Sequence, residues 1–172
     1  MAMEGFFDGL EQAVHDRNWH AALVLSLTLP DICGKVEHPG EKSGARYSMW
    51  FDAYVGAAYK SYYGPSREEY VHLSGRDCYA LRCSLLHEGG TDISRQSIRQ
   101  ALETFHFFTP GERGNVVHKN SVNERLYLMV DVFAGDVLAG ARTWWASKGL
   151  EVQQAAQAKL LTLQSTDGDL AL

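Results

Sequence analysis

Apolar side chains recur every three to four residues over much of this chain, the spacing of a helix that buries one face. In MEGFFDGLEQAVHDRN, Phe6, Phe7, Leu10 and Val14 share such a face and predict a helix over about 3–16. The 172 residues, 45% of them hydrophobic and 22% charged, fit one globular domain with a substantial core. No alternation of strands and helices indicates a doubly wound sheet, so we expect a mainly helical protein.

The segment WHAALVLSLTLPDICGKVE, residues 19–37, fits two structures. Apolar residues alternate from Leu23 to Leu29 as in a strand, yet alanine and leucine are good helix formers. We prefer a helix with Asn18 as its N-cap and Pro30 as a kink or a break, and keep the strand as the alternative.

Three further stretches have helical spacing. Residues 46–64 carry an aromatic stripe that we assign to the core, after a loop over 38–45 and before a turn over 64–70. Residues 74–90 read as a helix capped by Ser74 and ended by Gly89. Residues 130–149 are helical again, and 150–164 form a last helix or a continuation. Residues 166–172 look like a disordered tail.

Two short segments, FHFFTP (105–110) and RLYLMV (125–130), read as strands. They flank a polar, glycine-containing stretch and predict a long hairpin over 104–130 or a small sheet. The expected fold is therefore an all-α bundle with a small β-hairpin after residue 100, forming a single helical domain over 1–165.

The charge and the cysteine content limit which partners and which cellular compartment we expect. A net charge of −5 and a pI of about 5.8 argue against coating long nucleic acid by bulk charge, although a local basic pocket stays open. Cys33, Cys78 and Cys83 do not resemble a disulfide framework, which favours the cytoplasm. The acidic N-terminus does not resemble a signal peptide, and the run AALVLSLTLP is too short to span a bilayer, so we expect no membrane partner.

Familiar site motifs are absent from the sequence. It has no phosphate loop, GxGxxG or GxSxG, and no HxxxH or CxxC pair, so we predict no cofactor and no metal. Most of the histidines are scattered and are best explained as surface or structural side chains: His15, His20, His38, His72, His106 and His118.

The segment RCSLLHEGG, residues 82–90, raises a different question. On a helix that turns about 100° per residue, Arg76, Cys83 and His87 share one face, but Arg82 falls at about 240° from Arg76, inside the apolar arc. A guanidinium stays charged, so burying it alone is costly. Arg82 must therefore meet backbone carbonyls, a cleft open to water or an anion, or a carboxylate such as that of Asp31 or Asp52.

His87 has a structural and a functional interpretation. Near the end of a helix its charge would suit the dipole, and its ring would bond a free carbonyl. Histidine also titrates near neutral pH and can transfer a proton. The planar guanidinium of Arg82 can donate paired hydrogen bonds to phosphate oxygens. An arginine clamp with a proton-transferring histidine suffices for RNA cleavage without a metal.

An arginine, four to six residues and then a histidine on a long helix resemble the signature of the HEPN superfamily (higher eukaryotes and prokaryotes nucleotide-binding domain). Here the motif is Arg82 to His87. The resemblance implies a helical bundle, often a homodimer, and a metal-independent endoribonuclease of bacterial defence or toxin–antitoxin type. Arg82 would bind phosphate and His87 would be the general acid or base, supported by Arg76, Cys83 and Ser84.

That resemblance also implies RNA as a partner, with an antitoxin or a nucleotidyltransferase as a second one. More broadly, LTLPDICGKVEHP, RYSMWFDAYV and SGRDCYALRCSLLHEGG resemble an uncharacterised bacterial protein family over most of the first 90 residues. The rival hypothesis is a non-catalytic binding module in which Arg82 and His87 are structural and the loop over 111–120 makes the contacts. Two further alternatives are nucleotide binding and Cys83 as a nucleophile activated by His87.

Overall fold

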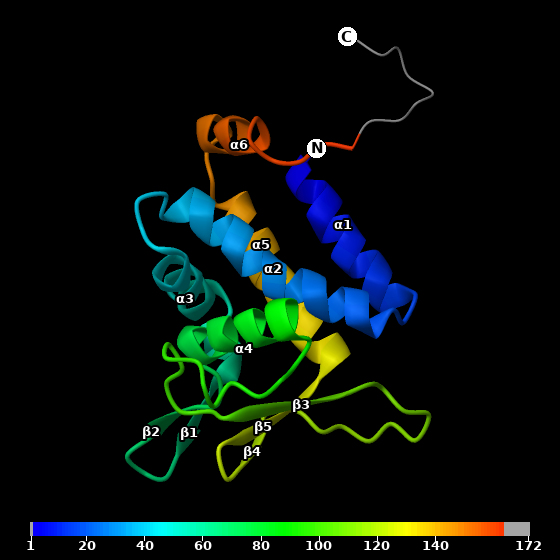
Figure 1. The fold of residues 1–172 in the computed structure, drawn as a ribbon, viewed down its shortest axis with the longest axis vertical. Coiled ribbons are helices and arrows are strands. Elements are labelled where there is room, and N and C mark those ends of the chain that lie inside the picture. The colour runs from blue at the N-terminus through cyan, green and yellow to red at the C-terminus, as the bar shows by residue number, and fades with distance from the viewer. Residues whose placement is uncertain (1, 164–172) are drawn as a thin grey trace.

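The computed structural model describes residues 2–163 and is mainly helical. Figure 1 shows the helices stacked above two small sheets, with the last helix across the far end of the bundle. None of the described helices combines the length and apolar character that a membrane crossing requires. The expected tail over 166–172 lies outside the described residues. The helices are α1 (Ala2–His15), α2 (Trp19–Glu37), α3 (Ser43–Tyr54), α4 (Gly75–Glu88), α5 (Val130–Ala146) and α6 (Leu150–Gln157).

Helix α2 lies at the centre and contacts α1, α3, α4 and α5. Aromatic side chains fill the space around it: Trp50 of α3 and Trp144 of α5 are fully buried and meet edge to face, with ring centroids 6.1 Å apart. Burying a large apolar side chain contributes about 1.5–3 kcal/mol, so this cluster is a main source of stability. The aromatic stripe expected in the core is confirmed for Tyr47, Trp50, Phe51 and Tyr59, but Tyr62 and Tyr63 are exposed.

The ambiguous segment 19–37 is one helix, so the strand alternative is wrong. The Asn18 side chain accepts a hydrogen bond from the Ala21 N–H, which confirms the predicted N-cap. Pro30 lies inside the helix and does not break it. Gly34 lets α3 approach closely, because a Cβ there would lie 2.7 Å from the carbonyl oxygen of Arg46.

The helix expected over 46–64 ends at Tyr54. A 3₁₀ turn, η1 (Gly56–Tyr59), follows, and then an antiparallel hairpin of β1 (Lys60–Tyr63) and β2 (Glu68–Val71). Gly64 and Arg67 adopt positive φ at the turn between these strands. The hairpin was not predicted, because the tyrosines of β1 continue the helical aromatic spacing of α3.

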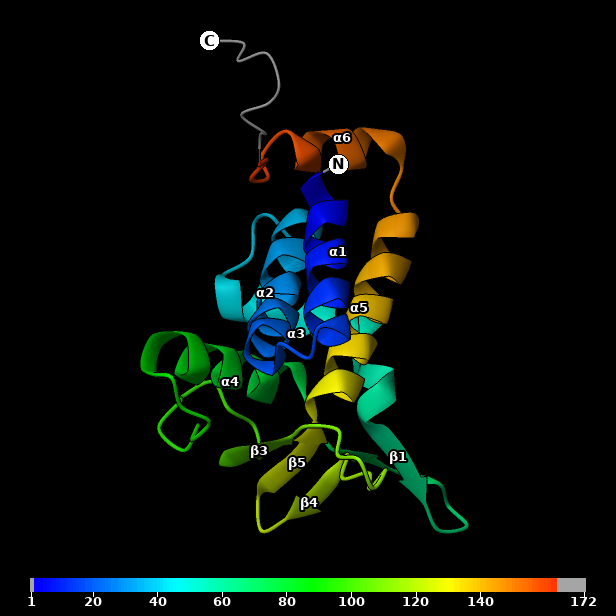
Figure 2. The ribbon, with the colours of Figure 1, turned by 90° about the vertical axis from the view of Figure 1, so that its right-hand side faces the viewer.

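The strands after residue 100 form a small sheet in the order β3 (Thr104–Phe108), β5 (Arg125–Met129), β4 (Asn120–Val122). Of the two expected arrangements, the small sheet is confirmed and the long hairpin is wrong, because β3 and β5 pair in parallel, with Thr104 opposite Arg125. Parallel strands need a long connection, and residues 109–124, which include β4, supply it. The true hairpin is β4–β5. Figure 2 shows both sheets at the same end of the bundle.

Helix α4 begins and ends as predicted. The Ser74 hydroxyl accepts a hydrogen bond from the Asp77 N–H, and Gly89 takes a left-handed φ of 70° at the C-terminus. Gly75 packs directly on the backbone of Ser48 in α3. These contacts fix where α4 crosses α2 and α3, and hence where Arg82 lies.

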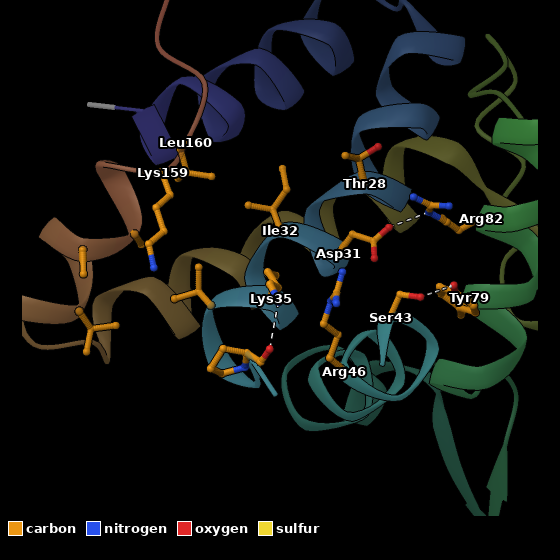
Figure 3. Close-up of a pocket in the computed structure, with 15 residues that line it drawn as sticks. Thr28, Asp31, Ile32, Lys35, Ser43, Arg46, Tyr79, Arg82, Lys159 and Leu160 are labelled. Carbon is orange, nitrogen blue, oxygen red and sulfur yellow. Dashed lines mark hydrogen bonds and ion pairs between the residues drawn. The ribbon is translucent and has the colours of Figure 1, made fainter. Parts of the chain in front are cut away.

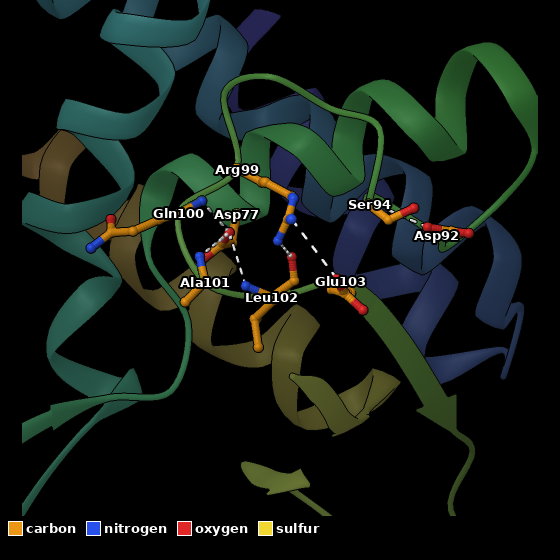
Figure 4. A network of polar contacts seen from close by, with 8 residues as sticks. All are labelled: Asp77, Asp92, Ser94, Arg99, Gln100, Ala101, Leu102 and Glu103. Atoms are coloured by element: carbon orange, nitrogen blue, oxygen red, sulfur yellow. Dashed lines mark hydrogen bonds and ion pairs between the residues drawn. The ribbon is translucent and has the colours of Figure 1, made fainter. Parts of the chain in front are cut away.

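The loop from α4 to β3 is held by the buried carboxylate of Asp77 (Figure 4). Its Oδ1 accepts hydrogen bonds from the backbone N–H groups of Gln100 and Ala101, at 2.7 and 3.2 Å, and a longer one from Leu102. The loop thereby covers one face of α4. That face includes the buried Ala80 and Ser84.

Candidate functional site

Arg82 bridges two helices. Its Nε lies 2.7 Å from Oδ2 of Asp31 in α2, and the two side chains are 24% and 14% exposed. Both atoms are buried and their geometry is that of an ion pair rather than an aligned hydrogen bond. Burial acts to lower the pKa of Arg82, but Asp31 and the neighbouring Cys83 raise it overall. Of the partners that the sequence left open for Arg82, the structure shows a carboxylate, that of Asp31. Asp52 instead accepts from the Gly75 N–H.

His87 lies beside the same guanidinium. Its Nε2 is 3.3 Å from Nη1 of Arg82, and the ring is exposed near the end of α4. Because a guanidinium only donates, the contact makes Nε2 the acceptor and puts the proton of the neutral ring on Nδ1. The ring thus meets an arginine where the structural interpretation expected a backbone carbonyl. His87 can take a proton at Nε2 once the Arg82 N–H turns to another acceptor.

The three supporting residues have separate roles. Arg76 donates from Nε to the carbonyl of Ile98, and the buried Ser84 donates from Oγ to the carbonyl of Asp92. Both side chains therefore hold the loop after α4. Cys83 is half-buried and interacts with Arg82. Of the sequence-predicted site residues, Arg82, His87 and Cys83 come together, and Arg76 and Ser84 point elsewhere.

A cavity of about 660 Å³ opens beside Arg82, between α2, α3, α4 and α6 (Figure 3). Four of its lining residues are cations and Asp31 is its one lining carboxylate. Sequence reasoning missed the cavity because its walls come from segments more than 100 residues apart. The cationic residues that line it are Lys35, Arg46, Arg82 and Lys159.

Two of these cationic side chains donate to backbone carbonyls. Lys35 donates from Nζ to the carbonyl of Pro39, and Arg46 donates from Nη1 to that of Glu41. The Nε of Arg46 is buried and has no hydrogen-bond partner. The Tyr79 hydroxyl lies 3.0 Å from Oγ of Ser43 on the wall next to α4.

A second polar cluster joins the bundle to the sheets. Tyr59 donates from its hydroxyl to Oδ2 of Asp136, and Nε2 of His118 is 3.9 Å from that same oxygen. The Nδ1 of His118 accepts from the Met129 N–H. Burial lowers the pKa of His118, more than the nearby Asp136 raises it. The structure thus gives His118 a structural partner, as expected of a scattered histidine.

Within residues 2–163, no three carboxylate, imidazole or thiol groups converge in a way that would hold a metal ion. Comparisons of the chain with protein-family models, with curated proteins and with solved structures find no match in any of the three. The case for a function therefore depends on the arrangement of Arg82, His87 and the cavity.

Proposed function

We propose that the protein is a metal-independent endoribonuclease with a HEPN-like bundle, acting in the bacterial cytoplasm in a defence or toxin–antitoxin system. The observation that carries the proposal is the 3.3 Å contact between Nη1 of Arg82 and Nε2 of His87. It puts a phosphate-binding group and a proton acceptor within reach of one phosphodiester.

In the proposed reaction, a phosphate oxygen accepts the Arg82 N–H and so releases Nε2 of His87. The imidazole then takes the proton of the ribose 2′-hydroxyl, whose oxygen bonds to phosphorus. Arg82 stabilises the charge that builds on the phosphoryl oxygens. The bond from phosphorus to the 5′-oxygen breaks, and the imidazolium returns its proton to that oxygen. The products are a 2′,3′-cyclic phosphate and a 5′-hydroxyl. Asp31 would orient Arg82 through the ion pair.

Two copies would supply a wider site. In a homodimer with α4 of each copy at the interface, the exposed His87 of both chains would face one RNA strand. Such a site would concentrate positive charge locally in a protein of net charge −5. An antitoxin or nucleotidyltransferase partner would then act by covering or modifying that site.

The test is cleavage of labelled single-stranded RNA in EDTA by wild type, Arg82→Ala and His87→Ala. His15→Ala is the matched control, because His15 is also an exposed histidine at the end of a helix. We expect cyclic-phosphate ends from wild type and the control, and a loss of about 10²–10⁴-fold in rate for His87→Ala. Retained cleavage by a folded His87→Ala variant would contradict the assignment of His87 as the general acid or base.

The second candidate is a binding module without catalysis. The observation that favours it is the ion pair, because Asp31 neutralises Arg82 and ties α2 to α4. In that case wild type leaves RNA intact while Arg82→Ala lowers the melting temperature, since the carboxylate of Asp31 remains buried without its partner. The same RNA assay, run beside thermal melts, separates the two candidates.

A further inference from the structure

We propose that the cavity between α2, α3, α4 and α6 binds a small amphipathic anion, with a carboxylate or phosphate head and an aliphatic body. This proposal does not depend on the ribonuclease activity. The cavity holds about 660 Å³, within the range of roughly 300–1,000 Å³ of small-molecule sites. It is too small for a folded partner and large enough for a short acyl chain.

The apolar part of the ligand is indicated by the cavity wall. Helix α6 crosses the end of the bundle and faces the C-terminal half of α2, so that aliphatic side chains line both sides (Figure 3). Tyr79 is the sole aromatic among the lining residues, and its ring packs edge-on against Tyr47 at 5.3 Å. An aliphatic body therefore suits the cavity better than a stacked nucleobase. The aliphatic lining residues are Ile32, Val36, Val152, Ala155, Ala156 and Leu160.

The anionic head is indicated by unmatched positive charge. Asp31 is already paired with Arg82. Lys35, Arg46 and Lys159 form no ion pair with any carboxylate in the part of the chain that the structure describes. Figure 3 shows Arg46 reaching from α3 toward Asp31, with Lys159 on the opposite side of the cavity. A ligand oxygen beside either cation would gain charge-assisted hydrogen bonds.

Arg46 supplies a second, independent sign of a ligand. Its Nε is buried and has no hydrogen-bond partner, although Arg46 lines the cavity. A buried donor on a charged group costs free energy while it stays unpaired. A turn of the side chain that brings this N–H to a carboxylate or phosphate in the cavity would remove the cost, which makes Arg46 the expected anchor of the head group.

The experiment is isothermal titration calorimetry of the full chain with decanoate and with decyl phosphate, each below its micellar concentration. Decanol has the same body without charge, and inorganic phosphate has the charge without a body. We expect saturable one-to-one binding of decanoate or decyl phosphate, at least tenfold tighter than that of decanol and of inorganic phosphate. The stronger of the two amphiphiles identifies the head group.

Variants locate the site. Arg46→Gln and Lys35→Gln should each weaken binding about tenfold, the usual effect of removing one charge-assisted hydrogen bond. Ala155→Trp should block the cavity, and because Ala155 is exposed the fold should survive. Arg95→Gln, at an exposed arginine outside the cavity, should bind as wild type does.

Three results would overturn the proposal. The first is no saturable binding of either amphiphile to a folded protein, and the second is binding that survives both Arg46→Gln and Ala155→Trp. The third is binding of adenosine monophosphate, titrated in the same way, when neither amphiphile binds. Because no RNA is used, failure here leaves the ribonuclease proposal untouched. Conversely, if the protein binds an amphiphile but does not cleave RNA, the ligand-site proposal stands and the ribonuclease proposal is wrong.

Discussion

At the scale of single residues, the central interaction is the contact of Asp31 with Arg82. The pair is largely but not fully buried, so removing one partner leaves a charge that water solvates poorly. We expect Asp31→Asn and Arg82→Gln each to lower the free energy of unfolding by about 1–3 kcal/mol. Urea denaturation would measure both, with the exposed Glu41→Gln as the control.

The double variant decides whether the two side chains act as a pair. Residues in direct contact couple by about 0.5–3 kcal/mol in double-mutant cycles. We therefore expect Asp31→Asn with Arg82→Gln to cost less than the sum of the single changes. Strict additivity would mean that Arg82 is held by other contacts, such as that with His87.

The contact between Arg82 and His87 shows a limit of the helical wheel. The wheel separates these positions by about 140°, so Arg82 was assigned to the apolar arc and His87 to the other face. A guanidinium on a long side chain nonetheless reaches round the helix to the ring at 3.3 Å. Sequence could predict that Arg82 needs an acceptor or an open cleft, with a carboxylate as one option, because that follows from burial and charge. It named Asp52 equally, because choosing between them requires the crossing of α2 and α4.

At the scale of elements, Asp77 joins α4 to the loop that precedes β3. Its Oδ1 accepts from Gln100 and Ala101, and the carboxylate is buried. Asp77→Ala would leave these N–H groups without their acceptor, and we expect a loss of about 2–4 kcal/mol. Asp92→Ala is the control in the same loop, because Asp92 is exposed and accepts from the Ser94 N–H.

Hydrogen exchange distinguishes a local from a global effect of that change. The Gln100 and Ala101 amides should lose protection first in Asp77→Ala, followed by the amides of β3, to which the loop leads. Unchanged protection at both amides would contradict the assigned role of Asp77. Asp92→Ala should cost less than about 1 kcal/mol and leave these amides protected.

Prediction from sequence succeeded for elements whose signals are local. Apolar spacing and caps such as Asn18, Ser74 and Gly89 depend only on residues close together in the sequence. The helices that they predict are present. Strand pairing is set by residues far apart. The parallel pairing of β3 with β5 follows from the path of residues 109–124, which no local pattern reveals. The cavity was missed for the same reason, since α6 becomes one of its walls only when the bundle is assembled.

At the scale of the whole molecule, the junction between the bundle and the sheets makes stability depend on pH. His118 lies there with Tyr59 and Asp136, its ring centroid 5.8 Å from that of Tyr59. Burial lowers the pKa of His118 below its ordinary value of 6.5, although Asp136 acts to raise it. His72, which directly follows β2 and whose Nε2 lies 2.8 Å from Oγ of Ser61, has its pKa lowered by burial too.

The direction of the pH effect follows from proton binding. Because the folded protein holds these imidazoles neutral, the unfolded chain binds more protons as the pH falls past 6.5, so the free energy of unfolding falls as well. Each unit by which a pKa is lowered corresponds to about 1.4 kcal/mol.

We expect His118→Gln to be less stable than wild type at pH 7.5, because Gln replaces the acceptor of the Met129 N–H imperfectly. It should also lose less stability between pH 7.5 and 5.5. Urea denaturation at both pH values, with the exposed His20→Gln as control, would measure the difference. An equal loss in wild type and His118→Gln would show that the junction does not titrate in this range.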